Sequence, residues 1–431
     1  MGRPPGSEER SRLGLLGREP SFRRLFLATL GSGFGTWLAL VALEWDVYHL
    51  THSSAWIAAL LIADLLPTFA IGLLAGPLVD RLPRRGLMVI ADLVRFGAFA
   101  VLPFTTNATQ IVVLAAIVGA ATGFFRPAAY AGIPNLVEEE DLATANSLLQ
   151  AVDNLTWAIG SLAGGALVAA AGVDAAYWIN SATFLVSAAL LVGIPQRLLQ
   201  VAEAASRGHW QDLKDGFSLT VRARALLTVL VAWNIAMLSN AAINVSEPSL
   251  ALVTFSSGAF GLGLMMGSAG IGLTIGAYLA ASWIEKRGLR NVYGASFGLM
   301  AVGIGIAAGA PNVWVAAACV VISGCGNGAA VVCNALLVQR GAPDALRGRV
   351  FAVLMSSNIA VLTLGMILAG KLTDVFGARW LWGAAAVVVG LAAIAGFILA
   401  GGVRQAQEHA EPEVDEHDAE SDALPVTAHR A

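Results

Sequence analysis

Twelve long apolar stretches recur along the chain, and they constrain its fold more than any other feature. As an α-helix, each stretch is long enough to cross about 30 Å of hydrocarbon. Lipid offers no partner for backbone N–H and C=O groups, so each span must be helical. The sequence therefore predicts an all-α membrane protein of twelve transmembrane helices. The predicted spans are 24–50, 55–79, 86–104, 110–132, 146–171, 174–194, 225–246, 257–284, 290–309, 312–339, 349–370 and 379–402.

Composition supports this prediction and argues against several other classes of protein. Only 13% of the residues are charged, against about 25% in a typical soluble domain. No domain-wide basic surface is present, which argues against nucleic-acid binding. The three cysteines, Cys319, Cys325 and Cys333, lie within one apolar stretch and form no CxxC pair. The sequence therefore predicts no disulfide framework, no metal site, no cofactor and no catalytic residue.

Positive charges predict how the chain is oriented in the membrane. If the N-terminus lies inside, only Lys371 and Arg379 of the 26 Lys and Arg residues fall near outer loops. This bias places both termini in the cytoplasm. The excess of Arg over Lys and the abundance of Ala and Gly are typical of GC-rich bacteria, so we expect a bacterial cell membrane.

Tryptophans provide a second indication of the membrane boundaries. Most of them fall at predicted span ends, as in the aromatic belt of membrane proteins. The belt does not explain Trp37, Trp157 or Trp233. The residues at predicted outer ends are Trp45, Trp56, Trp178, Trp314, Trp380 and Trp382.

The longest polar interruption divides the spans into two sets of six. Within it, Trp210, Leu213, Phe217 and Val221 recur at helical spacing, which predicts an amphipathic helix on the inner surface. The acidic tail has almost no apolar residues and is predicted to be disordered. The predicted regions are an N-terminal leader (1–23), a six-helix bundle (24–195), a linker (196–224), a second six-helix bundle (225–402) and a cytoplasmic tail (403–431).

The two sets of spans carry signs of an internal repeat. Asp80, Arg81 and Arg85 follow the second span, and Glu285, Lys286 and Arg290 follow the eighth at the same spacing. Internal duplication is common in secondary transporters. The sequence therefore predicts two pseudo-symmetric bundles.

Segment 76–85, GPLVDRLPRR, resembles the signature between spans two and three of the major facilitator superfamily, Gly-x-Leu-x-Asp-Arg followed by basic residues. The resemblance covers essentially the whole chain and implies that fold. It also implies a cytoplasmic latch that holds the outward-facing form. The alternative is that these charges only set the topology. The latch candidates are Gly76, Asp80, Arg81, Arg84 and Arg85, with Asp92 and Arg95 as partners.

Other segments resemble one branch of that superfamily. Segments 50–53, 125–128, 145–148 and 347–350 are similar to the twelve-span drug:proton antiporters, which include macrolide efflux and enterobactin export proteins. Segment 160–165, GSLAGG, resembles the antiporter motif Gly-Pro-x-x-Gly-Gly, with Ser161 replacing the proline. This replacement weakens the antiporter inference, and small-residue helix packing is an equal alternative.

Carboxyl groups inside spans are the candidates for proton coupling. Each intramembrane charge costs about 2.5–3.5 kcal/mol on insertion scales, so such residues usually serve a function. Asp64 lies well inside the second span, Glu44 in the outer third of the first and Asp153 in the fifth. Arg126 is a candidate counter-charge. Structural pairing is the alternative to proton carriage for these carboxyl groups.

The resemblance implies that spans one, four, seven and ten line a central cavity. Aromatic rings and amides on these spans suit bulky amphiphilic organic molecules. The alternative for each residue is interhelical packing and hydrogen bonding. The cavity candidates are Trp37, Tyr48, Trp233, Asn234, Asn240, Asn327 and Asn334.

These features together predict a monomeric, proton-coupled exporter of small amphiphilic organic compounds, and not an enzyme. No nucleotide-binding motif is present, which argues against direct ATP drive. A dedicated siderophore or metabolite exporter and a nutrient-uptake symporter remain alternatives. A membrane receptor is disfavoured because neither the linker nor the tail is large enough for a signalling domain.

Overall fold

The computed structural model describes residues 14–74, 82–199 and 217–408, and in these ranges the chain is helical without strands. Twelve of the described helices are long and apolar enough to cross a membrane, which confirms the predicted number. The first half contains α1 (Gly14–Arg18), α2 (Pro20–Thr51), α3 (Ser54–Leu74), α5 (Arg84–Val101), α6 (Ala108–Gly132), α7 (Leu142–Ala171) and α8 (Val173–Val192). The second half contains α10 (Arg224–Ser249), α11 (Gly258–Arg287), α12 (Leu289–Ala308), α13 (Val313–Gly341), α14 (Asp344–Phe376) and α15 (Ala378–Glu408).

The helices α14 and α15 extend well past their predicted spans. α14 continues beyond 370 to Phe376, where Gly377 ends it with a φ of 84°. α15 continues beyond 402 to Glu408. Apolar content marks only the part of a helix that lies in hydrocarbon, so a sequence-based span misses polar turns at its ends. Of the predicted amphipathic helix, 217–222 are helical, whereas Trp210 and Leu213 lie outside the described residues.

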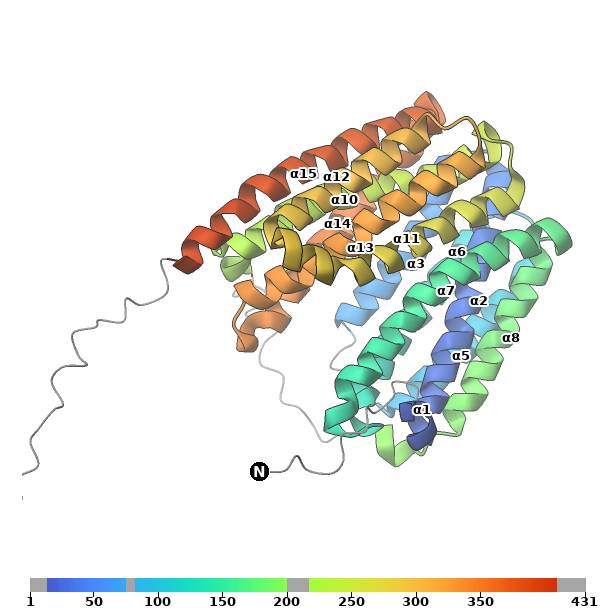
Figure 1. Cartoon of the computed structure of the whole chain (residues 1–431). Helices are drawn as coiled ribbons and strands as arrows, with labels where there is room; N and C mark the ends of the chain where they lie inside the picture. Colours follow the sequence, from blue (N-terminus) through green and yellow to red (C-terminus); the bar gives the residue numbers. More distant parts are fainter. Residues whose placement is uncertain (1–13, 75–81, 200–216, 409–431) are drawn as a thin grey trace, which may run out of the picture.

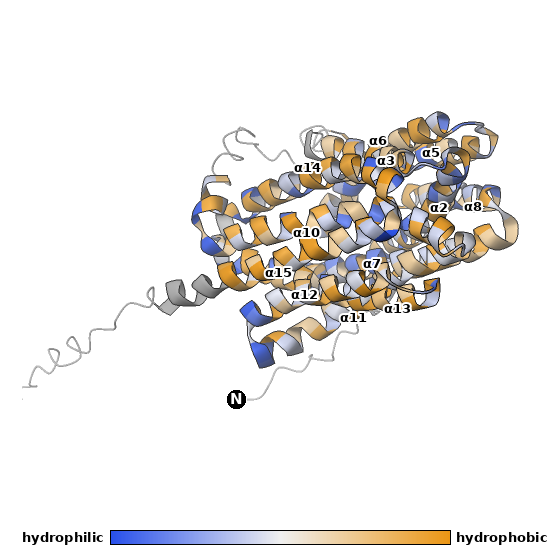
Figure 2. Cartoon of the chain, turned by 90° about the horizontal axis from the view of Figure 1, so that it is seen from above, coloured by the Kyte–Doolittle hydropathy of each residue, from blue (hydrophilic) through white to orange (hydrophobic). Residues whose placement is uncertain are grey.

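The helices form two bundles of six, as predicted. In the first bundle, α2 packs against α7 and α8, α3 against α6, and α5 against α6 and α8. In the second, α11 packs against α13, α12 against α13 and α15, and α10 against α14 and α15. Figure 1 shows the two bundles side by side. Figure 2 shows apolar residues along the lengths of the helices, which suits a lipid-facing surface.

An offset of 205 positions relates several corresponding helices of the two bundles. α5 begins at Arg84 and α12 at Leu289, which is 205 positions later. α6 begins at Ala108 and α13 at Val313, again 205 positions later. Asparagine caps both of the latter helices: Asn107 accepts from the Gln110 N–H, and Asn312 accepts from the Val315 N–H. The repeat seen in the loop charges therefore extends to helix starts and caps.

We call the end of the molecule where α2 begins the proximal end, and the end where α2 finishes the distal end. The bundles meet closely near the distal end through two crossings, α7 with α11 and α3 with α14. Each crossing depends on a glycine. A Cβ on Gly165 would stand 2.7 Å from the Ala259 carbonyl oxygen, and one on Gly370 would stand 2.7 Å from the Ala55 Cα. Gly165 and Gly370 are also 205 positions apart.

A carboxylate adds a polar contact to one of these crossings. Asp374 of α14 accepts hydrogen bonds from the Ser53 hydroxyl at 2.6 Å, the Ser54 N–H at 2.6 Å and the Ala55 N–H at 3.3 Å. It therefore caps the start of α3 from the opposite bundle. Toward the proximal end the bundles diverge (Figure 1), so the close contacts between halves lie mainly at the distal end.

Candidate functional site

A cavity of about 330 Å³ lies between the two bundles. Both halves line it, and α10 and α13 of the second half contribute the most residues. Its lining residues are Trp37, Leu40, Glu44, Leu61, Asp64, Leu65, Trp157, Asn240, Ile243, Asn244, Glu247, Met266, Ala269, Met300, Ile304, Val320, Ser323, Gly324, Asn327, Leu362, Met366 and Trp382. We call this the central cavity.

Three carboxyl groups line the central cavity, and none of the described lining residues is Lys, Arg or His. Glu44 of α2 and Glu247 of α10 are buried, with 3% and 8% of their surface exposed. Asp64 of α3 is accessible through the cavity. The site is therefore acidic, and its carboxyl groups come from both bundles.

Glu247 is a site residue that the sequence analysis missed. The predicted seventh span stops at 246, because a charged residue followed by Pro248 reads as the end of an apolar stretch. In the structure α10 continues through Pro248, and a π-helical turn, Leu250–Thr254, extends it. π-helical turns within helices occur frequently at functional sites. The sequence signal that could have identified Glu247 is an isolated Glu-Pro pair at the edge of a long apolar run.

Aromatic rings form one wall of the central cavity. Trp37 and Trp157 stack with centroids 5.3 Å apart and an interplanar angle of 20°. Neither fits the membrane-boundary belt, and their place in the cavity explains why they lie inside spans. Trp382 was assigned to the belt from sequence, and this assignment is wrong. Its side chain is 1% exposed, and its indole N–H has no hydrogen-bond partner among the described residues.

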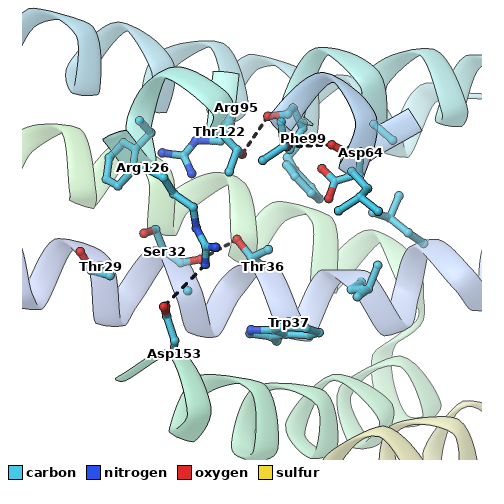
Figure 3. A pocket seen from close by; sticks show the side chains of 18 of the residues that line it. Thr29, Ser32, Thr36, Trp37, Asp64, Arg95, Phe99, Thr122, Arg126 and Asp153 are labelled. Atoms are coloured by element: carbon cyan, nitrogen blue, oxygen red, sulfur yellow. Dashed lines mark hydrogen bonds and ion pairs between the residues drawn. The ribbon is translucent and has the colours of Figure 1, made fainter. Parts of the chain in front are cut away.

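A second cavity of about 370 Å³ lies within the first bundle (Figure 3). Arg126 and Asp153 form an ion pair at 3.7 Å on its wall, and Tyr130 donates to Asp153 at 3.4 Å. Arg126 was predicted to be a counter-charge, and in the structure its partner is Asp153. Trp37 and Asp64 line this cavity as well as the central one, so the two cavities adjoin at these residues.

Arg95 lines the second cavity and is anchored by Asp92, with which it forms a buried ion pair. The Ser187 hydroxyl donates to Asp92 at 2.7 Å. The Arg95 guanidinium also lies over the rings of Phe125 and Phe184, at 4.3 and 4.6 Å from their centroids. Asp92 and Arg95 are both buried, and these contacts offset the cost of burying their two charges.

The latch candidates are only partly covered by the structure. Gly76, Asp80 and Arg81 lie outside the described residues. Arg84 donates to the Ala131 carbonyl oxygen at 2.8 Å, and Arg85 donates to the Ile194 carbonyl oxygen at 3.2 Å. These two contacts fasten the start of α5 to other segments of the first half. Asp92 and Arg95 pair with each other, also within the first half. The latch therefore stays a prediction.

The candidate cavity residues divide into two groups. Trp37, Asn240 and Asn327 line the central cavity. The other four line neither cavity. Tyr48 donates to the Ser249 hydroxyl at 3.4 Å across the two halves, and Trp233 packs on Phe297. Asn234 donates to the Ser357 hydroxyl at 3.1 Å, and Asn334 accepts from the Tyr293 hydroxyl at 2.7 Å.

The GSLAGG segment of α7 serves close helix packing in the structure. A Cβ on Gly160 would stand 2.9 Å from the Phe34 carbonyl oxygen of α2. A Cβ on Gly164 would stand 2.9 Å from the Leu38 Cα of the same helix. Gly165 faces α11 of the second bundle. This arrangement accounts for the glycines by packing, which was one of the two alternatives.

Comparison with known proteins places the chain among membrane transporters. A family model described as transmembrane secretion effector matches residues 16–427. The chain is 26% identical over 380 residues to the multidrug efflux pump Tap of Mycolicibacterium fortuitum, covering 82% of this chain and 89% of Tap. It is 25% identical over 374 residues to the enterobactin exporter EntS of Citrobacter koseri, covering 84% and 87%.

A solved structure shares the fold. The inward-facing crystal structure of a bacterial homologue of the iron transporter ferroportin superposes with a TM-score of 0.70 at 18% identity. The match covers 88% of this chain and 98% of that one. At this identity the likeness shows a common architecture.

Proposed function

Because the chain belongs to the transmembrane secretion effector family of major facilitator superfamily transporters, we propose that it exports small amphiphilic organic compounds in exchange for protons. One observation carries the proposal. An acidic, tryptophan-lined cavity lies between the two bundles, on the proximal side of their closest contacts. A substrate site between two halves that can rock is what alternating access requires.

The direction of opening follows from the predicted topology. With the positive charges inside, the proximal end faces the cytoplasm, and a closed distal end corresponds to an inward-facing state. The inward-facing ferroportin homologue, which has the same architecture, is consistent with this assignment. An exporter in this state would load its substrate from the cytoplasm.

Asp64 is our principal candidate for the proton carrier. Its side chain is accessible through the cavity and lies where the two cavities adjoin. Arg95 and Arg126 line the same second cavity, so their positive charges stand beside the proton-binding group. Protonation of Asp64 would remove a charge from the cavity and change the relative stability of the two access states. Glu44 is the second candidate, and Asp153, already paired with Arg126, is the third.

The test is transport in proteoliposomes with an imposed pH gradient. We expect the gradient to drive a fluorescent amphiphilic substrate. Asp64→Asn should slow this transport by about tenfold or more, because an amide cannot carry the proton. Asp46→Asn is the matched control, since Asp46 lines neither cavity and instead accepts from the Tyr177 hydroxyl at 2.9 Å. Unchanged gradient-driven transport by Asp64→Asn would reject the assignment of the carrier.

A dedicated siderophore exporter is a second candidate, favoured by the similarity to the enterobactin exporter. Metabolite profiling of a deletion strain separates the two: a single missing extracellular compound favours the dedicated role. An uptake symporter would move substrate toward the proximal side in oriented vesicles, which is the opposite of the direction we expect.

A further inference from the structure

Glu44 and Glu247 face the same cavity from opposite bundles. Glu44 belongs to α2 of the first half and Glu247 to α10 of the second. Both side chains are buried, and both line the central cavity, so their carboxyl groups share one enclosed, largely apolar space. Any motion that separates the bundles at the distal end would therefore act on both carboxyl groups.

Two ionised carboxylates at this position lack compensation. Asp64 is the remaining ionisable residue of the described lining, and it is also acidic. The lining residues from α7, α11, α12, α13, α14 and α15 are apolar, aromatic, amide or hydroxyl-bearing. Isolated buried charges are strongly unfavourable, and like charges on neighbouring carboxyl groups oppose simultaneous ionisation. The pair therefore requires a positive charge from outside the protein.

The surroundings of the pair also fit an organic ligand. The stacked rings of Trp37 and Trp157 offer aromatic faces in the same cavity. Cations bind over such faces, and Trp binds them best. The unpartnered indole N–H of Trp382 supplies one hydrogen-bond donor for an acceptor on the ligand.

We propose that Glu44 and Glu247 form a cross-bundle carboxylate pair that binds one positive charge at a time, either a proton or the cationic group of an aromatic, amphiphilic cargo. The inference rests on the proposed function and adds the substrate class. Cationic compounds are selected over neutral ones of the same shape. Glu247 is a specificity-determining residue supplied by the second half.

The test measures equilibrium binding of tetraphenylphosphonium, a permanent organic cation, to the full-length protein in lipid nanodiscs. Triphenylphosphine oxide, a neutral molecule with a similar aryl body, is the comparison ligand. Titrations at about pH 8 and about pH 5.5 distinguish the two sources of charge, since protons compete for carboxylates more strongly at the lower pH. No gradient is imposed, so the outcome is independent of whether a pH gradient drives transport.

We expect the cation to bind more tightly at the higher pH and the neutral ligand to compete poorly. Glu247→Gln and Glu44→Gln should each weaken cation binding by about tenfold or more, because each removes a buried charge partner. Each should also flatten the pH dependence. Glu247→Asp keeps the charge and should retain the preference for the cation, which separates loss of charge from loss of folding. Asp46→Asn, on the same helix as Glu44, should bind as the unmodified protein does.

Two results would overturn the proposal. One is equal binding of the cation and the neutral ligand by the unmodified protein. The other is unchanged cation affinity in both glutamine variants. If the pair binds cations as expected but no gradient drives their transport, the binding inference stands and the proposed proton coupling fails.

Discussion

The two bundles share one helical scaffold but differ in where they carry charge. Positions related by the offset of 205 show the contrast directly. The first half has Asp64, Asp92, Arg95, Arg126 and Asp153, where the second has Ala269, Phe297, Met300, Val331 and Asn358. Because the second bundle has the same architecture without these charges, folding alone does not require them. Each one costs free energy in a membrane, which indicates a functional role in the first half.

The second half contributes differently. Its lining of the central cavity is mainly apolar, with amides at Asn240, Asn244 and Asn327, and with Glu247 as its ionisable group among the described residues. Among the described residues that line the two cavities, the ion pairs lie in the first bundle, and the second supplies a wall and one carboxyl group of the central cavity. The three predictions that follow test this contrast, beginning with the largest expected effect.

Breaking the buried ion pair of the first half should have the largest effect on stability. Asp92→Asn removes the ion-pair partner of the buried Arg95 and leaves the rings of Phe125 and Phe184 beside its guanidinium. We expect a loss of about 3–5 kcal/mol in the free energy of unfolding, as for other buried pairs with one partner removed. Thermal unfolding in detergent, followed by intrinsic fluorescence, measures it.

The second half supplies the control for this prediction. Met300 stands where the first half has Arg95, and Met300→Leu should cost less than about 1.5 kcal/mol because volume is conserved. The double variant Asp92→Leu/Arg95→Met replaces the ion pair with two apolar side chains. It should recover much of the lost unfolding free energy, because apolar replacement of a buried pair often leaves stability unchanged. A double variant less stable than Asp92→Asn would contradict this account.

Removing Asp374 should shift the equilibrium between access states. Its carboxylate accepts two backbone N–H groups and a hydroxyl across the bundles, and position 169, its counterpart 205 residues earlier, is alanine. Asp374→Ala should destabilise distal closure by about 1–3 kcal/mol. Spin-label distances between positions 52 and 376, in a variant lacking the native cysteines, should gain a longer population.

Lys371 provides the matched control for Asp374. It lies one turn earlier on α14 and is exposed, so Lys371→Ala should leave the distance distribution unchanged. An unchanged distribution in Asp374→Ala would show that the glycine-mediated crossings close the distal end by themselves.

The smallest expected effect is the loss of a helix cap that both halves share. Asn107→Ala and Asn312→Ala each remove the N-cap of corresponding helices. Each variant should lower the free energy of unfolding by about 1 kcal/mol, and the two losses should be nearly equal. Thermal unfolding of the two variants side by side measures the difference. If the two losses in unfolding free energy differ by more than about 1 kcal/mol, the corresponding caps do not contribute equally to stability.

Much of the fold follows from the sequence because the signals are local. Lipid requires continuous apolar helices, so the spans are visible as runs of residues. The half repeat is visible in loop charges at equal spacing. Asp64 and Glu44 were found because a carboxyl group inside a long apolar run is conspicuous. Glu247 was missed because Pro248 made it look like the end of a run.

Other features depend on which face of a helix meets its neighbour. A tryptophan near a span end has the same local pattern whether it faces headgroups or a cavity, and Trp382 faces the cavity. Trp233 and Asn234 carry the same apolar context as Asn240, yet only Asn240 lines the central cavity. Rotation of α10 about its axis decides between them, and that rotation is set by packing against α14 and α15.

The sequence by itself determined the twelve spans, their grouping into two bundles and two of the three cavity carboxyl groups. Each of these is encoded by hydrophobicity over short stretches of chain. Only the tertiary structure decided that Glu44 and Glu247 face one cavity, that the Asp92–Arg95 pair is buried, and that Asp374 caps α3 from the other bundle. Each of these arrangements depends on how different helices pack together, and close packing fixes which side chains face one another.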